Sequence, residues 1–282
     1  MKVYVTYGDD NFIIQKKNAL KFAKKNGNFD KIFSFSKKDI DKEFYERNSN
    51  ILNRKRGGGY WIWKPYFIKR VLSEVEEGDF VFYSDAGAIF LKSVDILINE
   101  LEKNKQDIMG YELPFIEKQW TKRELFKTMN LDRKVYGESN QMLAGLILIK
   151  KTKFSLNFID EWLKYICVEQ NVTDILSEEQ EKCFKEHRHD QSIFSLLYKK
   201  YNLKPFKEPT QYGVNSEFYK EKKIVIKPKH YNMSCYNPKI YKENYGVVIY
   251  RYPGKKLGYS LIKYKLKRLL LKARLLKNKV NY

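Results

Sequence analysis

The chain has 282 residues and a formal net charge of +21, with 43% hydrophobic, 16% aromatic and 32% charged residues. This apolar and aromatic content excludes a disordered chain, and the length suits one large α/β domain, or one domain with a small appendage. The positive charge favours a polyanionic partner, which could be nucleic acid, an anionic bilayer or a phosphorylated substrate.

The compartment is indicated by the cysteines and by the first residues. Cys167, Cys183 and Cys235 are widely spaced and form no CxxC pair, which favours free thiols in a reducing compartment over a disulfide framework or a zinc site. The amino terminus reads as a strand and not as a signal peptide. The longest strongly apolar stretch, residues 143–149, is far shorter than a bilayer span. We expect a cytoplasmic protein, soluble or peripheral.

In chain order, short apolar runs alternate with helical patterns. Strands are predicted at residues 3–7, 31–36, 79–83, 107–112 and 141–150. Helices are predicted at residues 12–25, 63–76, 94–104, 154–168 and 190–201, with a charged helix or loop at 38–53 and an irregular segment at 113–139. This alternation predicts an α/β sheet with helices on its faces, within a domain that spans residues 1–254.

A single carboxylate follows the third predicted strand, in the run FVFYSDAG at residues 80–87. Ligands of open α/β sheets bind at the carboxyl ends of strands. Asp85, beside the small residues Ser84, Ala86 and Gly87, could therefore approach a ribose hydroxyl or a divalent ion that bridges a diphosphate. The alternative is an aspartate that caps a turn.

Three glycines interrupt the pattern in the run RGGGYWIWKP at residues 56–65. They allow a ligand to approach the backbone and offer amides to an anion, and Arg56 and Lys64 add positive charge. A solvated surface loop is the alternative. Tyr60, Trp61 and Trp63 are too large and apolar for such a loop, and they either stack on a ligand or enter the core.

The most polar cluster of the second half is HRHDQ at residues 187–191. Asp190 stands where a helix could begin, so N-capping would explain it. His187 or His189 could serve as a base, although the spacing alone does not show this.

Four motifs in this order resemble those of GT-A fold glycosyltransferases. The run FVFYSDAG resembles the Asp-x-Asp region, and RGGGYWIWKP resembles the glycine, aromatic and Lys-Pro segment of bacterial polysaccharide transferases. NQMLAG at residues 140–145 resembles the strand beneath the donor sugar, and RHDQSIF at residues 188–194 resembles the Asp-Gln segment near the reacting centre. The resemblance covers about residues 3–230.

The resemblance implies a GT-A, Rossmann-like sheet that binds a nucleotide-sugar. The implied activity is transfer of a hexose-type sugar, from a UDP-sugar or another nucleotide-sugar, to a glycan or lipid-linked acceptor in surface polysaccharide biosynthesis. It assigns Asp85, Asp190 and His189 to catalysis. It places these residues at the donor: Thr6, Tyr7, Asp9, Arg56, Gly58, Tyr60, Trp63, Lys64, Ser84, Ala86, Gly87, Asn140, Gln141, Ala144, Gly145 and Gln191.

The same resemblance implies a Mn²⁺ or Mg²⁺ ion held by Asp85 and His230. One departure bears on this expectation, because Gly87 stands where the second acid of Asp-x-Asp should be. A single protein carboxylate would hold the ion more weakly. The alternative for His230 is an ordinary loop histidine.

The last 28 residues, 255–282, contain ten basic side chains and no Asp or Glu. Apolar residues recur there at helical intervals from Ile262 to Val280, which predicts a basic amphipathic helix. Such a helix suits the anionic inner face of the cell membrane, whereas a helix docked on the core is the alternative.

Two other function classes stay open. One is a nucleic-acid-binding protein that uses the basic tail, although no RNA-recognition or zinc-finger signature is present and we expect no nucleic acid. The other is a membrane-associated scaffold that has lost activity, an option that Gly87 keeps open.

Overall fold

The computed structural model describes residues 1–214 and 245–250, together with the single positions 262, 266 and 269. Six strands form one sheet in the order β2-β1-β3-β6-β5-β7. They are β1 (Lys2–Tyr7), β2 (Lys31–Phe35), β3 (Phe80–Asp85), β5 (Ile108–Ile116), β6 (Asn140–Lys150) and β7 (Phe206–Lys207). A second, two-stranded sheet pairs β4 (Ile89–Phe90) with β8 (Val248–Ile249).

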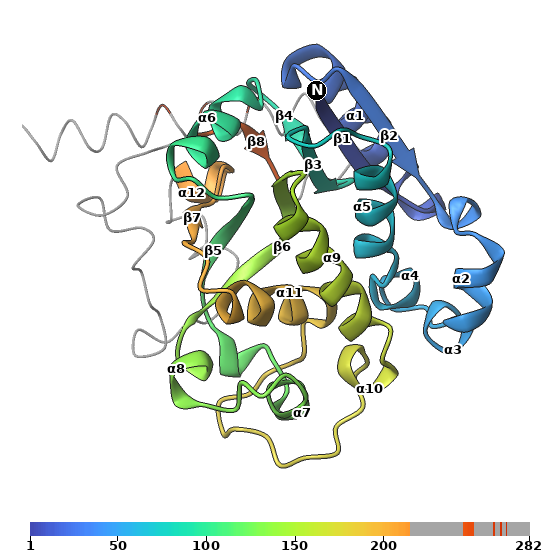
Figure 1. The fold of residues 1–282 in the computed structure, drawn as a ribbon, viewed down its shortest axis with the longest axis vertical. Coiled ribbons are helices and arrows are strands. Elements are labelled where there is room, and N and C mark those ends of the chain that lie inside the picture. Colours follow the sequence, from blue (N-terminus) through green and yellow to red (C-terminus); the bar gives the residue numbers. More distant parts are fainter. Residues whose placement is uncertain (215–244, 251–261, 263–265, 267–268, 270–282) are drawn as a thin grey trace, which may run out of the picture.

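Helices cover both faces of the large sheet, which confirms the expected α/β class. On one face α5 (Trp63–Ser73), α9 (Lys153–Ile166) and α11 (His189–Lys200) lie side by side (Figure 1). On the other face lie α1 (Ile13–Phe22) and α6 (Asp95–Lys103). Side chains of β1 alternate between the two layers, with Val3 and Val5 in one core and Tyr4 in the other.

The remaining helices are short. They are α2 (Lys42–Arg47), α3 (Ser49–Leu52), α4 (Gly57–Tyr60), α7 (Arg123–Thr128), α8 (Lys134–Gly137), α10 (Glu169–Val172) and α12 (Gln211–Val214). Among the described residues no helix combines the length and apolar content needed to cross a bilayer.

The strand order creates a topological switch point between β1 and β3. Strand β1 pairs in parallel with β2 on one side and with β3 on the other, and Tyr7 at the end of β1 is the register partner of Asp85 at the end of β3. After β1 the chain continues to β2 on one side of the sheet, whereas after β3 it continues to β5 and β6 on the other side. A crevice therefore opens between the ends of β1 and β3. Open α/β sheets bind their ligands in such crevices.

The expectation of an irregular segment at residues 113–139 is wrong. Strand β5 continues to Ile116 and is buried throughout, and α7 and α8 follow it. The strand passes Pro114 because its pairing with β6 shifts register between Glu112 and Ile116, so the missing N–H of the proline interrupts no regular ladder.

Several sequence predictions lie outside the described residues, namely those for His230, Cys235 and most of the basic segment at 255–282. Positions 262, 266 and 269 have helical backbone, and their side chains are 58%, 55% and 63% exposed. Cys167 and Cys183 are free thiols, as expected.

Candidate active site

Two adjoining cavities lie at the crevice between β1 and β3. The strand-end cavity, of about 300 Å³, is lined by the ends of both strands and by the glycine run. The carboxylate cavity, of about 480 Å³, is lined by Lys64, Asp85 and Asp190 together with residues 186–189. Both cavities are lined by Phe12, Trp61, Asp85 and Gly87, so they form one continuous site.

A buried lysine joins the two carboxylates of this site. The Nζ atom of Lys64, whose side chain is 3% exposed, donates a hydrogen bond to Asp190 and lies 3.4 Å from Oδ1 of Asp85. It also donates to the carbonyl oxygen of Ala144 at 3.2 Å. Lysine and proline open α5, Asp85 ends β3 and Asp190 lies in the first turn of α11, so three elements converge on one ammonium group.

The oxygens of Asp85 are held by two tyrosines. The hydroxyl of Tyr83 donates to Oδ1 at 2.9 Å, and that of Tyr250 donates to Oδ2 at 2.6 Å. The backbone of Tyr250 is fixed in turn by Gln211, whose side-chain amide exchanges two hydrogen bonds with it. Sequence reasoning missed Tyr250, because it lies 165 residues from Asp85 and no local pattern marks it.

A glycine at position 145 makes room for this contact. A Cβ atom at Gly145 would lie 1.7 Å from the hydroxyl oxygen of Tyr250 and 2.8 Å from Oδ2 of Asp85. Any side chain here would therefore separate Tyr250 from Asp85. The contact between Tyr250 and Asp85 therefore requires glycine at position 145, one of the positions predicted to lie at the donor.

Burial and charge set the protonation of the cluster. Burial raises the pKa of Asp190 to about 6, although Lys64 opposes the shift. Burial alone would lower the pKa of Lys64, but the charges of Asp190 and Asp85 outweigh it and raise that pKa. At neutral pH the lysine is charged and Asp190 is largely ionised, with a pKa that suits a proton acceptor.

The glycine run forms a left-handed turn and not an open loop. From Gly57 to Trp61 all five residues have φ between 51° and 96°, and the amide of Tyr60 donates to the carbonyl oxygen of Arg56 at 2.7 Å. Left-handed helical backbone costs about 1–2 kcal/mol for each residue that carries a side chain, which here means Tyr60 and Trp61. The ring of Trp61 stacks on His189 with centroids 5.4 Å apart.

This turn corrects the expected role of the glycine amides. The amides of Gly58 and Gly59 donate to the carbonyl oxygens of Lys55 and Arg56, so they are used inside the turn and are not offered to an anion. The open face of Gly58 remains, because a Cβ atom there would meet nothing closer than 3.7 Å. A ligand in the strand-end cavity can therefore approach this backbone closely.

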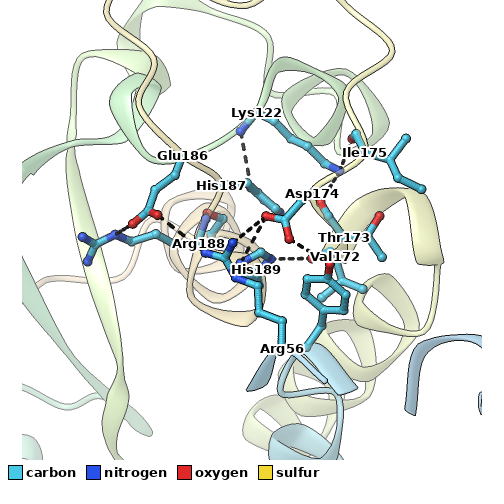
Figure 2. A network of polar contacts seen from close by, with 12 residues as sticks. Arg56, Lys122, Val172, Thr173, Asp174, Ile175, Glu186, His187, Arg188 and His189 are labelled. Atoms are coloured by element: carbon cyan, nitrogen blue, oxygen red, sulfur yellow. Dashed lines mark hydrogen bonds and ion pairs between the residues drawn. The ribbon is translucent and has the colours of Figure 1, made fainter. Parts of the chain in front are cut away.

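Ion pairs tie the glycine turn to the segment before α11 (Figure 2). Arg56 lies 3.1 Å from Asp174 and 3.5 Å from Glu186. The hydroxyl of Tyr60 donates to Asp174 at 2.8 Å, which closes the contact from the other side. Of these residues, Arg56 and Glu186 line the carboxylate cavity.

Both histidines of the polar cluster are buried and neutral. The Nδ1 atom of His189 donates to the carbonyl oxygen of Val172 at 2.7 Å, and burial lowers the pKa of His189 to about 4. Burial also lowers the pKa of His187 well below its usual value. His189 lines the carboxylate cavity, but its low pKa makes it a weaker base than Asp190.

N-capping does not explain Asp190. The N-cap position of α11 is Arg188, and Asp190 is the second helical residue. Its carboxylate faces Lys64.

Most of the predicted site residues line the two cavities. These are Tyr7, Asp9, Arg56, Gly58, Trp63, Lys64, Asp85, Ala86, Gly87, Gly145, His189, Asp190 and Gln191. The others lie behind this wall, namely Thr6, Tyr60, Ser84, Asn140, Gln141 and Ala144. Gln141 and Ala144 still reach the site indirectly, since Gln191 donates to Gln141 at 2.8 Å and accepts from the amide of Ala144 at 3.4 Å.

The described residues do not fit the expected Mn²⁺ or Mg²⁺ ion. Such ions take several oxygen ligands, usually with carboxylates among them, and residues 1–214 and 245–250 hold no cluster of three or more Asp, Glu, His or Cys that could bind a metal. Asp85 already accepts from Tyr83 and Tyr250, and the cation beside it is the ammonium of Lys64. His230, the other expected ligand, lies outside the described residues.

No protein-family model matches the sequence, and no curated protein matches it. Among solved structures, the chain resembles glycosyltransferase GlyE of Streptococcus pneumoniae TIGR4, with 20% identity over 78% of this chain and 50% of that one, at a TM-score of 0.40. It also resembles the bifunctional glycosyltransferase WbbM, with 13% identity over 69% and 37% of the two chains and a TM-score of 0.41. For galactosyltransferase LgtC, in complex with donor and acceptor sugar analogues, the identity is 17% over 68% and 69%, and the TM-score is 0.39.

The matches thus span half of the GlyE chain and about a third of the WbbM chain. Likenesses at these identities and TM-scores carry no argument about the activity of this chain.

Proposed function

We propose that this chain is a glycosyltransferase that transfers a sugar from a nucleotide-sugar donor. The observation that carries the proposal is the meeting of Asp85 and Asp190 around Lys64, in a cavity that opens at the topological switch point. We assign the nucleotide to the adjoining strand-end cavity, where Tyr7 and Trp63 stack with ring centroids 3.7 Å apart and form an aromatic wall.

The charge of the carboxylate cavity suits a neutral sugar. Its lining contains three cationic side chains and three carboxylates: Arg56, Lys64 and Arg188, and Asp85, Glu186 and Asp190. A chain with a net charge of +21 therefore has no excess positive charge at this site. A nucleic-acid groove would show such an excess, so the balance favours a hydroxyl-rich ligand that the carboxylates can bind through hydrogen bonds.

The chemistry assigned to the site divides between the two acids. Asp85 accepts hydrogen bonds from hydroxyl groups of the donor sugar, since part of its carboxylate is exposed to both cavities. Asp190, whose pKa is about 6, accepts the proton of the acceptor hydroxyl as the hydroxyl oxygen bonds to the anomeric carbon of the sugar and the bond from that carbon to the departing diphosphate breaks. Lys55 lines the strand-end cavity and Arg56 lines the carboxylate cavity, just before the glycine turn. Their positive charges stabilise the departing diphosphate.

We propose in addition that the donor is a UDP-hexose and that the acceptor is a glycan or lipid-linked molecule, in the synthesis of a surface polysaccharide. This addition is supported by the order of the four sequence motifs. A divalent ion forms no part of the proposal, because the ammonium of Lys64 already contacts both acids.

We further propose that transfer takes place on the inner face of the cell membrane. Three exposed apolar side chains follow one another at the N-cap and start of α1, with Phe12 48%, Ile13 55% and Ile14 51% exposed, and Phe12 lines both cavities. The basic segment at residues 255–282 would supply the attraction to anionic lipid.

A binding screen tests the main proposal. UDP-, GDP-, dTDP- and CMP-sugars are added to the protein, each with and without Mn²⁺, and the unfolding temperature is measured, since a ligand that binds the folded state raises it. We expect sugars of one nucleotide class to raise the unfolding temperature. In Asp85→Asn, the same rise should need at least ten times more of that donor. Asp160→Asn removes an equal charge from an exposed ion pair with Lys69 and serves as the control. Absence of any shift across the donors would refute the proposal.

A further inference from the structure

The ammonium group of Lys64 occupies an oxygen-lined position of the kind a metal ion would take. Its three contacts are an oxygen of Asp190, Oδ1 of Asp85 at 3.4 Å and the carbonyl oxygen of Ala144 at 3.2 Å. Two carboxylates and a backbone carbonyl are also typical ligands of Mg²⁺ and Mn²⁺. Here a side chain of the protein supplies the cation.

We infer that the site works without a divalent metal, and that Lys64 draws Asp85 and Asp190 together in the way a bound metal ion would. This inference rests on the proposed function. Lys64 acts through the two acids and is therefore a positioning residue.

Electrostatics supports a single cation at this position. A divalent ion bound to the remaining lone pairs of Asp85 would lie close to the buried ammonium, and their repulsion would be weakly screened at a site where Lys64 is 3% exposed. The carboxylate oxygens are also partly used, because the hydroxyls of Tyr83 and Tyr250 donate to them. Fewer lone pairs of Asp85 therefore remain for an ion.

The glycine at position 87 agrees with the same inference. In the Asp-x-Asp pattern the second acid completes a metal site, and this chain has Gly87 there, at the boundary of both cavities. The second carboxylate of this site comes instead from Asp190 in α11, which also contacts the ammonium. The two acids are thus arranged around Lys64.

The first experiment measures binding of the donor found in the screen, by calorimetry, to the wild-type protein in EDTA and in Mn²⁺. We expect dissociation constants within a factor of about two of each other. Binding that needs Mn²⁺ would overturn the inference and leave the proposed function standing. Failure of every nucleotide-sugar to bind in both conditions would instead remove the proposed function.

The second experiment needs no donor. Lys64→Ala removes the ammonium and leaves the three oxygens around a vacant space, so this variant should bind one Mn²⁺ ion per chain, measured by the loss of the free Mn²⁺ signal in electron paramagnetic resonance. The wild-type protein and the double variant Lys64→Ala/Asp190→Asn should bind none at this position. Lys199→Ala is the matched control, because it uncovers the buried Glu117 at a distance from both cavities.

The outcomes separate clearly. A Mn²⁺ ion bound to the wild-type protein and lost in Asp85→Asn would overturn the inference, and so would a folded Lys64→Ala variant without a Mn²⁺ site. Circular dichroism shows whether each variant is folded. If Lys64→Ala does not fold, the measurement in EDTA on the wild-type protein still decides the question.

Discussion

Asp190 and Lys64 form a buried pair in which each group controls the charge of the other. Burial raises the pKa of Asp190 to about 6, and the positive charge of Lys64 keeps it from rising further. The acid is then protonated below pH 6 and ionised above it, so a reaction in which Asp190 accepts a proton gains rate as the pH rises through that value.

This sign gives the first prediction. We expect kcat/KM for sugar transfer or donor hydrolysis to rise with pH through a midpoint near 6, which is the pKa of Asp190. In Lys64→Met the opposing charge is lost, so the midpoint should move to higher pH. Lys199→Met, whose ammonium contacts Glu117, should leave it in place. An unchanged midpoint in Lys64→Met would contradict the assignment of the rise to Asp190.

The second prediction concerns the contact between Tyr250 and Asp85. Gly145→Ala places a methyl group where the tyrosine hydroxyl lies, so it should act like Tyr250→Phe, and both should lose this hydrogen bond. A hydrogen bond to a charged group is worth about 1.5–3 kcal/mol, which corresponds to a loss of roughly 10- to 100-fold in kcat/KM.

Steady-state kinetics of the single and double variants check this effect. The double variant should be no worse than either single one, because both changes remove the same contact. Gly137→Ala is the control, since a Cβ atom there would be 3.6 Å from its nearest neighbour. Additive losses in the double variant would show that Gly145 and Tyr250 act separately.

At the scale of elements, the left-handed turn at residues 57–61 shapes the strand-end cavity. Gly58 has φ of 59° and an open face toward the side chains of Tyr7, Asp9 and Trp63. Gly78, which does not line either cavity, has φ of 85° and nothing within 4 Å of its Cβ position. Both glycines therefore have a positive φ, but only Gly58 lines a cavity.

The third prediction uses this pair. Gly58→Ala and Gly78→Ala should each lower the free energy of unfolding by about 1 kcal/mol, measured by urea denaturation, because alanine disfavours positive φ. Only Gly58→Ala should weaken donor binding in calorimetry, since its methyl group enters the cavity. Equal donor affinity in the two variants would mean that the ligand does not approach Gly58.

At the scale of the whole molecule, the net charge of +21 and the balanced charge of the carboxylate cavity point to different partners for different surfaces. The site suits a neutral sugar, whereas the excess of lysine and arginine is available to an anionic surface. Each basic residue near an anionic membrane contributes about 1 kcal/mol, and salt screens this attraction.

The fourth prediction separates these two kinds of binding. Replacing three lysines of the basic segment by glutamine should weaken binding to vesicles that contain phosphatidylglycerol, measured by co-sedimentation, and leave donor binding unchanged. An equal change of charge elsewhere on the surface should have a smaller effect on the vesicles. The tested positions are Lys263, Lys265 and Lys267, and the control positions are the exposed Lys38, Lys103 and Lys153. Equal losses in the two triple variants would contradict a role specific to the segment.

The sequence by itself determined the longer elements and the strand end at which one acid lies. Short apolar runs predicted five of the six strands of the large sheet and missed β7, and the acid that ends FVFYSD, which was predicted to lie at a ligand site, lines a cavity. Glycines 57–59 were predicted to break the regular pattern, which they do. These features are local, since strand periodicity and the φ freedom of glycine are properties of neighbouring residues.

The tertiary structure alone decided which side chains meet. Asp190 reaches Lys64 across 126 positions of the chain, and Tyr250 reaches Asp85 across 165. The hand of the glycine turn also depends on distant partners, because His189 stacks on Trp61 and Asp174 accepts from Tyr60. Such pairings follow from how helices and strands pack on one sheet, and a charge or hydroxyl in the sequence does not reveal its partner until that packing brings the two together.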